Sequence, residues 1–487
     1  MELRDYTSYD ALGLVGLIEA GEVSPQEVAS AAVEASDLVN PHINAVAEIW
    51  TDESVLSVSE LDANAAFYGV PFLIKDLAIT RAGRLNELGS RLAAGVRATE
   101  DSTLMSKFRK SGLVTIGRTT TPEFAISTTT EGAATGPTRN PWDIRRSAGG
   151  SSGGSGAAVA AGIVPVAHAT DGGGSIRVPA SANGLFGIKP SRGRVSNGPA
   201  VDEVWSGLAV QLGVSRTVRD SAALLDAAQG GAVGEPYYIA SPESSFLSAS
   251  LVDPRSLRIG FMRDPLNGTK TDPAVADQIE LTARHCEYLG HEVTRTELDL
   301  GVSWEAFVFA NAQFWTVNTA AWIDAIAQFT GRPPGDDILE PSTHAVYEYG
   351  RNVTGPNLLS ALDVRNSVTR AIGAFFEKHD ILLTPVIPRL PPLIGEYNDS
   401  QERLDGLEWV NHVFSHSPFT AIANVAGVPA MSVPLYEDPG SGMPVGSQFF
   451  AGFGQEALLF SLAGQLERSQ PWSARKPKIW AGSPSVG

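Results

Sequence analysis

Three residues of the chain have the types and surroundings that hydrolysis by a serine requires. Lys75 ends the apolar run 70–74, while Ser151 and Ser175 each follow consecutive glycines. A serine hydroxyl is a weak nucleophile and needs a base that accepts its proton as it attacks. A lysine serves as that base only where burial lowers its pKa and makes the amine neutral. An apolar strand that ends at Lys75 would supply such burial. One serine hydroxyl would then relay the proton of the other serine to the lysine.

A glycine triplet precedes Ser175 and has a chemical use of its own. Consecutive glycines let backbone N–H groups converge on a developing oxyanion, because no side chain blocks the approach of the carbonyl group. We expect Asp171 and Arg177, on either side of this loop, to brace it rather than touch the scissile bond. The residues predicted to support the site are Ser152, Thr170, Asp171 and Arg177.

The segments that hold these residues resemble a known family when they are read together. They are GVPFLIKD (69–76), GGSSGGS (149–155) and TDGGGSIR (170–177). In this order and spacing they resemble the amidase signature family. The resemblance continues through NGLFGIKP (183–190) and NVAGVPA (424–430), so it covers nearly the whole chain except its middle.

The resemblance implies a role for each matching residue. Ser175 matches the family's nucleophile, Ser151 matches the serine that follows a cis peptide bond and relays the proton, and Lys75 matches the base. After the amine leaves, water would hydrolyse the acyl-enzyme along the same relay. The family's oxyanion hole matches Gly172, Gly173, Gly174 and Ser175.

The alternation of strand-like and helical segments along the chain favours an α/β architecture. Strand-like runs at 70–74, 114–117 and 164–167 alternate with helical stretches and glycine turns, and Ser24 to Glu27 is typical of a capping box at a helix start. Further helices are expected near 272–289, 304–329 and 358–378. The family fold implies a large, mixed, twisted β-sheet covered by helices on both faces.

We expect a single amidase domain over 1–487. Its predicted parts are N-terminal helices at about 1–65, a catalytic core at about 66–230, a variable segment at about 231–380, and a C-terminal part of the core at about 381–475. The variable segment, which alternatively forms a second domain or a cap, is expected to shape the substrate pocket, because loops over a rigid scaffold usually do so. Trp315, in an aromatic cluster of this segment, and Thr128 are the predicted substrate contacts.

Several short runs resemble one branch of the family. Residues 138–142, 146–147 and 178–181 are most similar to the 6-aminohexanoate-cyclic-dimer hydrolase branch, near aryl acylamidases and urethane-cleaving amidases. This likeness implies a hydrolase of neutral secondary, aryl or oligomeric amides, with carbamates and esters as further substrates. The alternative is the glutamine-hydrolysing A subunit of a tRNA-dependent amidotransferase, which acts only with partner chains.

The composition limits the kinds of molecule that the protein is expected to bind. The formal charge of −18 disfavours nucleic acid, because neutralising phosphates requires clustered lysine and arginine. No apolar run approaches the length of a membrane-spanning helix, and the start of the chain lacks the pattern of an export signal. The lone Cys286 excludes an intramolecular disulfide and fits a cytoplasmic protein. We expect a monomer or homodimer that acts on a small amide without a cofactor or metal.

Two other patterns in the sequence suggest alternative sites. Gly149 to Gly153 also matches G-x-S-x-G, the nucleophile elbow of α/β-hydrolases, which would make Ser151 the nucleophile with a distant histidine such as His379 or His412. The elbow should follow a strand, however, and here a polar turn precedes it. His412 and His416 have the spacing of metal ligands on a helix but lack the glutamate of a metalloprotease motif, so we expect a packed or pocket-lining pair.

Overall fold

The computed structural model describes residues 1–52, 61–201 and 203–483. In this part of the chain eleven strands form one sheet, in the order β1-β3-β2-β8-β10-β9-β14-β15-β13-β11-β12. Their bounds are β1 (Val46–Ile49), β2 (Pro71–Lys75), β3 (Val114–Thr119), β8 (Val166–Asp171), β9 (Phe186–Lys189), β10 (Val210–Ser215), β11 (Arg258–Phe261), β12 (Glu292–Arg295), β13 (Ile381–Pro385), β14 (Ala430–Glu437) and β15 (Pro444–Ala451). Two small hairpins lie outside it: β4 (Glu131–Gly132) with β5 (Gly136–Pro137), and β6 (Arg139–Asn140) with β7 (Asp143–Ser147).

The sheet is mixed, as predicted. Strand β2 runs parallel to both β3 and β8, and β11 runs parallel to β12 and β13. The central strands β8, β10, β9, β14 and β15 pair antiparallel to one another. Parallel pairing of β2 with β8 places the carboxyl ends of both strands at one edge of the sheet. Lys75 and Asp171, the last residues of these two strands, therefore lie at that edge.

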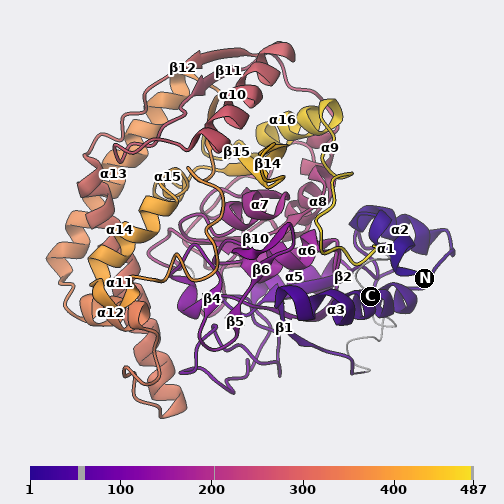
Figure 1. Cartoon of the computed structure of the whole chain (residues 1–487), viewed down its shortest axis with the longest axis horizontal. Coiled ribbons are helices and arrows are strands. Elements are labelled where there is room, and N and C mark those ends of the chain that lie inside the picture. Colours follow the sequence, from indigo (N-terminus) through magenta and orange to yellow (C-terminus); the bar gives the residue numbers. More distant parts are fainter. Residues whose placement is uncertain (53–60, 202, 484–487) are drawn as a thin grey trace.

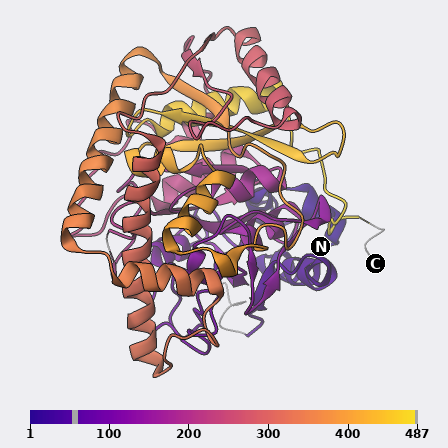
Figure 2. The same ribbon diagram turned by 60° about the vertical axis from the view of Figure 1, so that its left-hand side comes forward.

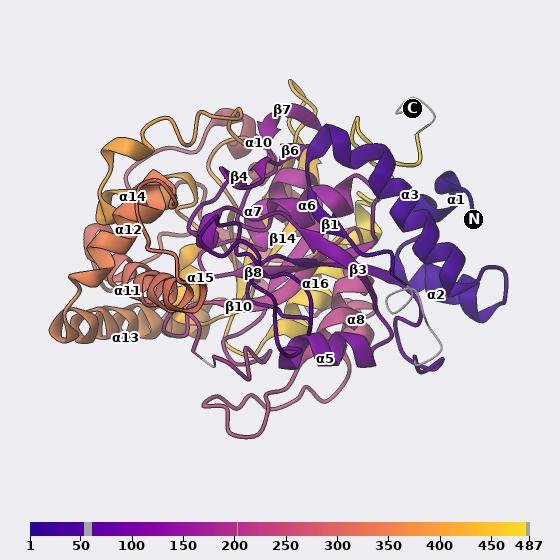
Figure 3. The ribbon, with the colours of Figure 1, turned by 90° about the horizontal axis from the view of Figure 1, so that it is seen from below.

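Helices cover both faces of the sheet, and Figure 3 shows them above and below it. One group contains α3 (Pro25–Ile43), α6 (Gly153–Ala160) and α7 (Arg177–Asn183); the other contains α5 (Thr103–Lys110), α8 (Val218–Ala228) and α16 (Glu456–Ser469). The predicted capping box starts α3, because the Ser24 hydroxyl accepts from the Glu27 N–H and the Glu27 carboxylate accepts from the Ser24 N–H. The remaining helices near the sheet are α1 (Leu3–Ser8), α2 (Ala11–Glu19), α9 (Phe246–Ser250) and α10 (Pro273–Tyr288).

A separate helical layer stands at one side of the sheet (Figures 1 and 2). It comprises α11 (Trp304–Thr330), α12 (Pro341–Arg351), α13 (Gly355–Lys378), α14 (Gly406–His416) and α15 (Ala421–Ala426), with the short turns η1 (Glu123–Ala125) and η2 (Gln401–Arg403) nearby. These helices share a hydrophobic cluster with Phe124 and Trp205, which belong to loops of the sheet. A larger cluster fills the space between the sheet and its own helices. The layer therefore closes over the loops that hold the predicted catalytic residues.

In the described residues, no helix is both long enough and apolar enough to cross a membrane.

Candidate active site

Lys75 ends β2 and is completely buried. Its ammonium nitrogen Nζ lies 2.7 Å from the Ser151 hydroxyl and 2.9 Å from the Thr170 hydroxyl. Burial lowers the pKa of Lys75 well below its usual value, although the negative charge of Asp171 acts in the opposite direction. Burial disfavours the charged amine because the low-dielectric interior replaces water. The site therefore favours the neutral form that a base requires.

Ser151 lies in the glycine turn that leads into α6. The peptide bond between Gly150 and Ser151 is cis, as the family resemblance implies. The neighbouring Ser152 fastens this turn to strand β8, because its hydroxyl accepts from the Thr170 N–H at 3.2 Å and donates to the Thr170 carbonyl oxygen at 3.4 Å. The turn and the strand thus hold Ser151, Thr170 and Lys75 in one hydrogen-bonded group.

Ser175 lies between β8 and α7, directly after the glycine triplet. Within the described residues, its hydroxyl makes no hydrogen bond, and the backbone N–H groups of 172–175 donate to nothing. The loop is nevertheless anchored, because the Thr420 hydroxyl donates to the Gly173 carbonyl oxygen at 2.5 Å. Four consecutive N–H groups with no internal partner are suited to bind an oxyanion.

Asp171 and Arg177 form a buried ion pair behind this loop. Two guanidinium nitrogens of Arg177 lie 2.8 and 2.9 Å from the two carboxylate oxygens of Asp171, and both side chains are fully buried. Burial alone would raise the pKa of Asp171, but the charge and hydrogen bonds of Arg177 hold it below its ordinary value. Arg177 also donates to the Thr420 carbonyl oxygen at 2.8 Å and to the Asn424 side chain at 2.7 Å. The pair thus ties the loop 172–176 to the C-terminal part of the chain.

Ser151 and Ser175 lie on the wall of one cavity. Thr170 and Gly172 also contribute to this wall. The remaining wall is mostly apolar, with Leu77, Val204, Trp205, Val210 and Trp322 among its residues, and it carries one amide pair, Asn197 and Gln211. A site with two serines, a buried lysine of lowered pKa, and N–H groups that have no partner in the described residues has the parts that acyl transfer needs.

Comparison with known proteins decides the family. The model of the Amidase family matches residues 27–460 of the chain. Over 480 residues the chain is 36% identical to the 6-aminohexanoate-cyclic-dimer hydrolase of Paenarthrobacter ureafaciens, and the alignment covers 96% of each protein. The chain belongs to the amidase signature family. The resemblance inferred from the sequence motifs is thereby confirmed, and the protein is a hydrolase of carbon–nitrogen bonds.

Solved structures of this amidase family have the same fold. The chain matches a 6-aminohexanoate cyclic dimer hydrolase with a TM-score of 0.92 and 35% identity, covering 98% of this chain and 99% of that chain. It matches a bacterial aryl acylamidase with a TM-score of 0.86 and 26% identity, covering 96% and 97%. The predicted amidase signature fold is therefore confirmed across nearly the whole length of the amidase.

The structure places Trp315, one of the two predicted substrate contacts, behind the glycine loop of the amidase. Its ring lies 4.5 Å from that of Trp205 and 5.4 Å from that of Phe414, measured between centroids. A Cβ atom built on Gly173 would lie 2.6 Å from Trp315 Cζ2. Trp205 and Trp322 are the indoles on the cavity wall. Trp315 thus supports the loop from behind, because the inward face of α11 packs against it.

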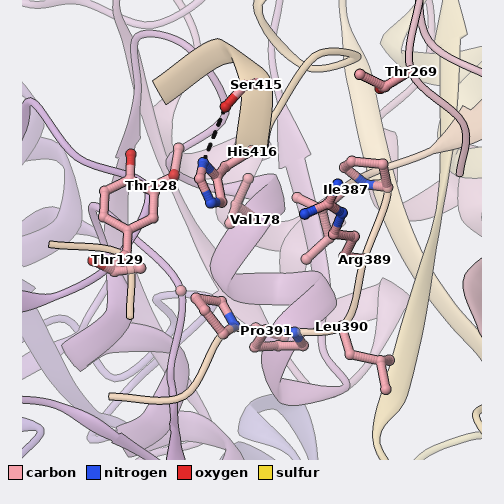
Figure 4. A pocket seen from close by; sticks show the side chains of 15 residues that line it. Thr128, Thr129, Val178, Thr269, Ile387, Arg389, Leu390, Pro391, Ser415 and His416 are labelled. Atoms are coloured by element: carbon pink, nitrogen blue, oxygen red, sulfur yellow. Dashed lines mark hydrogen bonds between the residues drawn. The ribbon is translucent and has the colours of Figure 1, made fainter. Parts of the chain in front are cut away.

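Thr128, the second predicted contact, lines a different pocket, which Figure 4 shows from close by. This pocket borders Gly149 and Val178, which are close in sequence to the two serines. In Figure 4 the side chains of Arg389 and His416 point toward one another across it. Thr128 and Ser175 therefore do not share a cavity wall.

The two histidines of α14 are packed, as the sequence interpretation expected. The rings of His412 and His416 both lie against that of Tyr397, and His416 lines the pocket of Figure 4. Burial lowers the pKa of His412 to about 4. The nucleophile-elbow alternative needs a histidine at Ser151, whereas the partner of that hydroxyl in the structure is Lys75.

Sequence reasoning missed the amide pair and the indoles of the cavity wall. Asn197 and Trp205 come from the loop between β9 and β10, Gln211 from β10, and Trp322 from α11. Their only signal in the sequence was indirect: a buried glutamine in an otherwise apolar strand, 210–214, requires a partner.

Proposed function

We propose that this amidase hydrolyses neutral amides through an acyl-enzyme, with Ser175 as nucleophile and Ser151 and Lys75 as its proton relay. The observation that carries the proposal is the buried hydrogen bond between Lys75 Nζ and the Ser151 hydroxyl, in a site that lowers the pKa of the lysine. As Ser175 attacks the carbonyl carbon, its proton passes to Ser151 while Ser151 gives its own to Lys75. The amine leaves with the proton returned along the same path.

The free N–H groups of 172–175 are proposed to stabilise the oxyanion. Donors that are already aimed at the developing charge require no rearrangement during the reaction, and removing one typically costs about 10²- to 10³-fold in rate. Water then attacks the acyl-enzyme and gives its proton to the relay. Asp171 and Arg177 hold the loop in this geometry without contacting the substrate.

Secondary amides, including cyclic or linear oligomers of 6-aminohexanoate and aryl amides, are the proposed substrates. The likeness to a 6-aminohexanoate-cyclic-dimer hydrolase supports this choice, as does a cavity wall made mostly of apolar residues. Apolar walls suit the methylene chains or aromatic rings of such amides. Carbamates and esters are secondary candidates, because the same acyl transfer accommodates them. A cytoplasmic monomer or homodimer stays a prediction.

The test is hydrolysis of a substrate panel by the wild-type protein and by Ser175→Ala. The panel contains 6-aminohexanoate cyclic dimer, an anilide, a simple aliphatic amide, a carbamate and glutamine. We expect turnover of the secondary amides by the wild type and none by the variant. Turnover of glutamine alone, or no turnover without added partner chains, would replace the proposal with the amidotransferase subunit.

A further inference from the structure

Gln211 lies beside the catalytic group although no catalytic step uses it. It belongs to β10, which pairs antiparallel with β8, and it stands directly opposite Thr170. Side chains of directly opposite residues project from the same face of an antiparallel pair, with Cβ atoms about 4.5–5.5 Å apart. The Thr170 hydroxyl contacts Lys75 Nζ. Gln211 is therefore the neighbour of Thr170, whose hydroxyl contacts the proposed base, Lys75.

A buried histidine fixes the orientation of the Gln211 amide. The backbone N–H of Lys75 donates to His168 Nδ1 at 3.3 Å, so this nitrogen carries the lone pair and the proton of the neutral ring is on Nε2. His168 Nε2 lies 3.1 Å from Gln211 Oε1 and donates to it. His168 is fully buried, and burial lowers its pKa to about 3, so the ring stays neutral. The side-chain oxygen of Gln211 therefore already accepts a hydrogen bond from within the protein.

The nitrogen of the same amide has one N–H group to spare. One N–H of Gln211 Nε2 donates to Asn197 Oδ1 at 2.9 Å. A primary amide carries two such donors, and the second has no partner in the described part of the chain. Gln211 is only 3% exposed, yet it lines the cavity that contains Ser175. A buried donor without a partner costs free energy, which a ligand that supplies an acceptor recovers.

We infer that Gln211 is a specificity-determining residue that donates a hydrogen bond to a carbonyl oxygen in the acyl part of the substrate. The inference rests on the proposed acyl-enzyme chemistry and adds the substrate class: acyl chains that carry a second amide, as oligoamides do. A plain alkyl chain fits the apolar wall but leaves the Gln211 N–H unpaired. The amidase therefore discriminates between acyl chains of equal length by the presence of this acceptor.

The test compares pairs of anilides with acyl chains of equal length. In one member the chain is plain alkyl, and in the other an amide group interrupts it, two to five methylenes from the scissile carbonyl. For the wild type we expect the amide-bearing member to have a kcat/KM about tenfold higher at the best position, since a net hydrogen bond contributes about that factor. The gain should appear mainly in KM, because the contact forms in the ground state as well.

Two variants separate recognition from structure. Gln211→Met keeps the length of the side chain without its donor, and we expect the ratio of the two kcat/KM values to fall to near one. Gln313→Met is the matched control: Gln313 is 2% exposed and its amide bonds to Phe309 and Tyr349, away from the cavity. It should keep the wild-type ratio. Because the readout is a ratio, a partly folded preparation does not change it.

Three outcomes are distinguishable. A wild-type protein that hydrolyses both members equally, in a reaction that Ser175→Ala abolishes, overturns the role of Gln211 and leaves the proposed function intact. Retention of a tenfold preference in Gln211→Met also overturns it. Failure of the wild type to hydrolyse either member contradicts the proposed function itself.

Discussion

Gly173 offers a direct test of how the nucleophile loop is held. Its φ is not positive, so its backbone is outside the left-handed region that favours glycine, and the surroundings of the residue are what oppose a side chain. A Cβ atom at this position would meet Trp315 Cζ2 at 2.6 Å and Cη2 at 3.1 Å. Carbon atoms in contact are normally about 3.5–4.0 Å apart, so Gly173→Ala has to displace either the indole or the loop by about 1 Å.

The displacement has a calculable effect on the rate. The indole of Trp315 is held between Trp205 and Phe414, whereas the N–H groups of residues 172–175 have no partner in the described residues. We expect the loop to give way. Loss of one aligned oxyanion donor lowers kcat about 10²- to 10³-fold, or about 2.7–4 kcal/mol of transition-state stabilisation. KM should change much less, because the donors act mainly on the transition state.

The assay is steady-state hydrolysis of the best anilide by Gly173→Ala, by Trp315→Leu and by the double variant. Trp315→Leu removes the ring atoms that meet the new Cβ, so it should restore at least tenfold of the lost kcat. Gly373→Ala is the control, because a Cβ there meets nothing within 4 Å and helix α13 favours alanine over glycine. A wild-type kcat in Gly173→Ala, or no recovery in the double variant, would refute the reasoning.

Three further predictions concern buried titratable groups. Only neutral Lys75 acts as base and burial lowers its pKa, so kcat/KM should rise with pH to a plateau that begins below the pKa of an exposed lysine; Lys75→Ala should lose this limb in a pH–rate profile, along with most activity. Asp171→Asn leaves the Arg177 charge without a counter-ion and should lower the free energy of unfolding by about 3 kcal/mol in denaturant titration; a loss under about 1 kcal/mol contradicts this. Burial raises the pKa of Cys286 to about 12, so thiol alkylation of the folded protein should leave mass and activity unchanged.

The sequence pointed to Lys75, Ser151 and Ser175 because their signals are local, and their catalytic roles stay predictions. Lys75 ends an apolar run that forms β2, and glycine turns place Ser151 and Ser175 at the starts of helices. Helices also followed from local patterns: the segments expected at 272–289 and 304–329 became α10 and α11 within one residue at either end.

Local sequence patterns could not predict the residues of the cavity wall, because distant segments of the chain form it. Gln211 and Trp322 are far apart in sequence and meet only through the order of strands and the docking of α11. The aromatic cluster of this segment led to the prediction that Trp315 contacts the substrate, but the local pattern did not show which indole of α11 lines the cavity. Trp322 lies on the wall and Trp315 behind the loop because residues about two turns apart on one helix meet different partners.

The central claim is that Ser175 is the nucleophile. The most direct measurement is reaction of the wild-type protein with a sulfonyl fluoride, followed by digestion and mass spectrometry of the modified peptide, with Ser175→Ala in parallel. We predict one adduct per chain on Ser175 and no adduct in the variant. The loss of hydrolysis should be proportional to the fraction of chains that carry the adduct. An adduct on Ser151, or undiminished labelling of Ser175→Ala, would contradict the account and favour the nucleophile-elbow alternative.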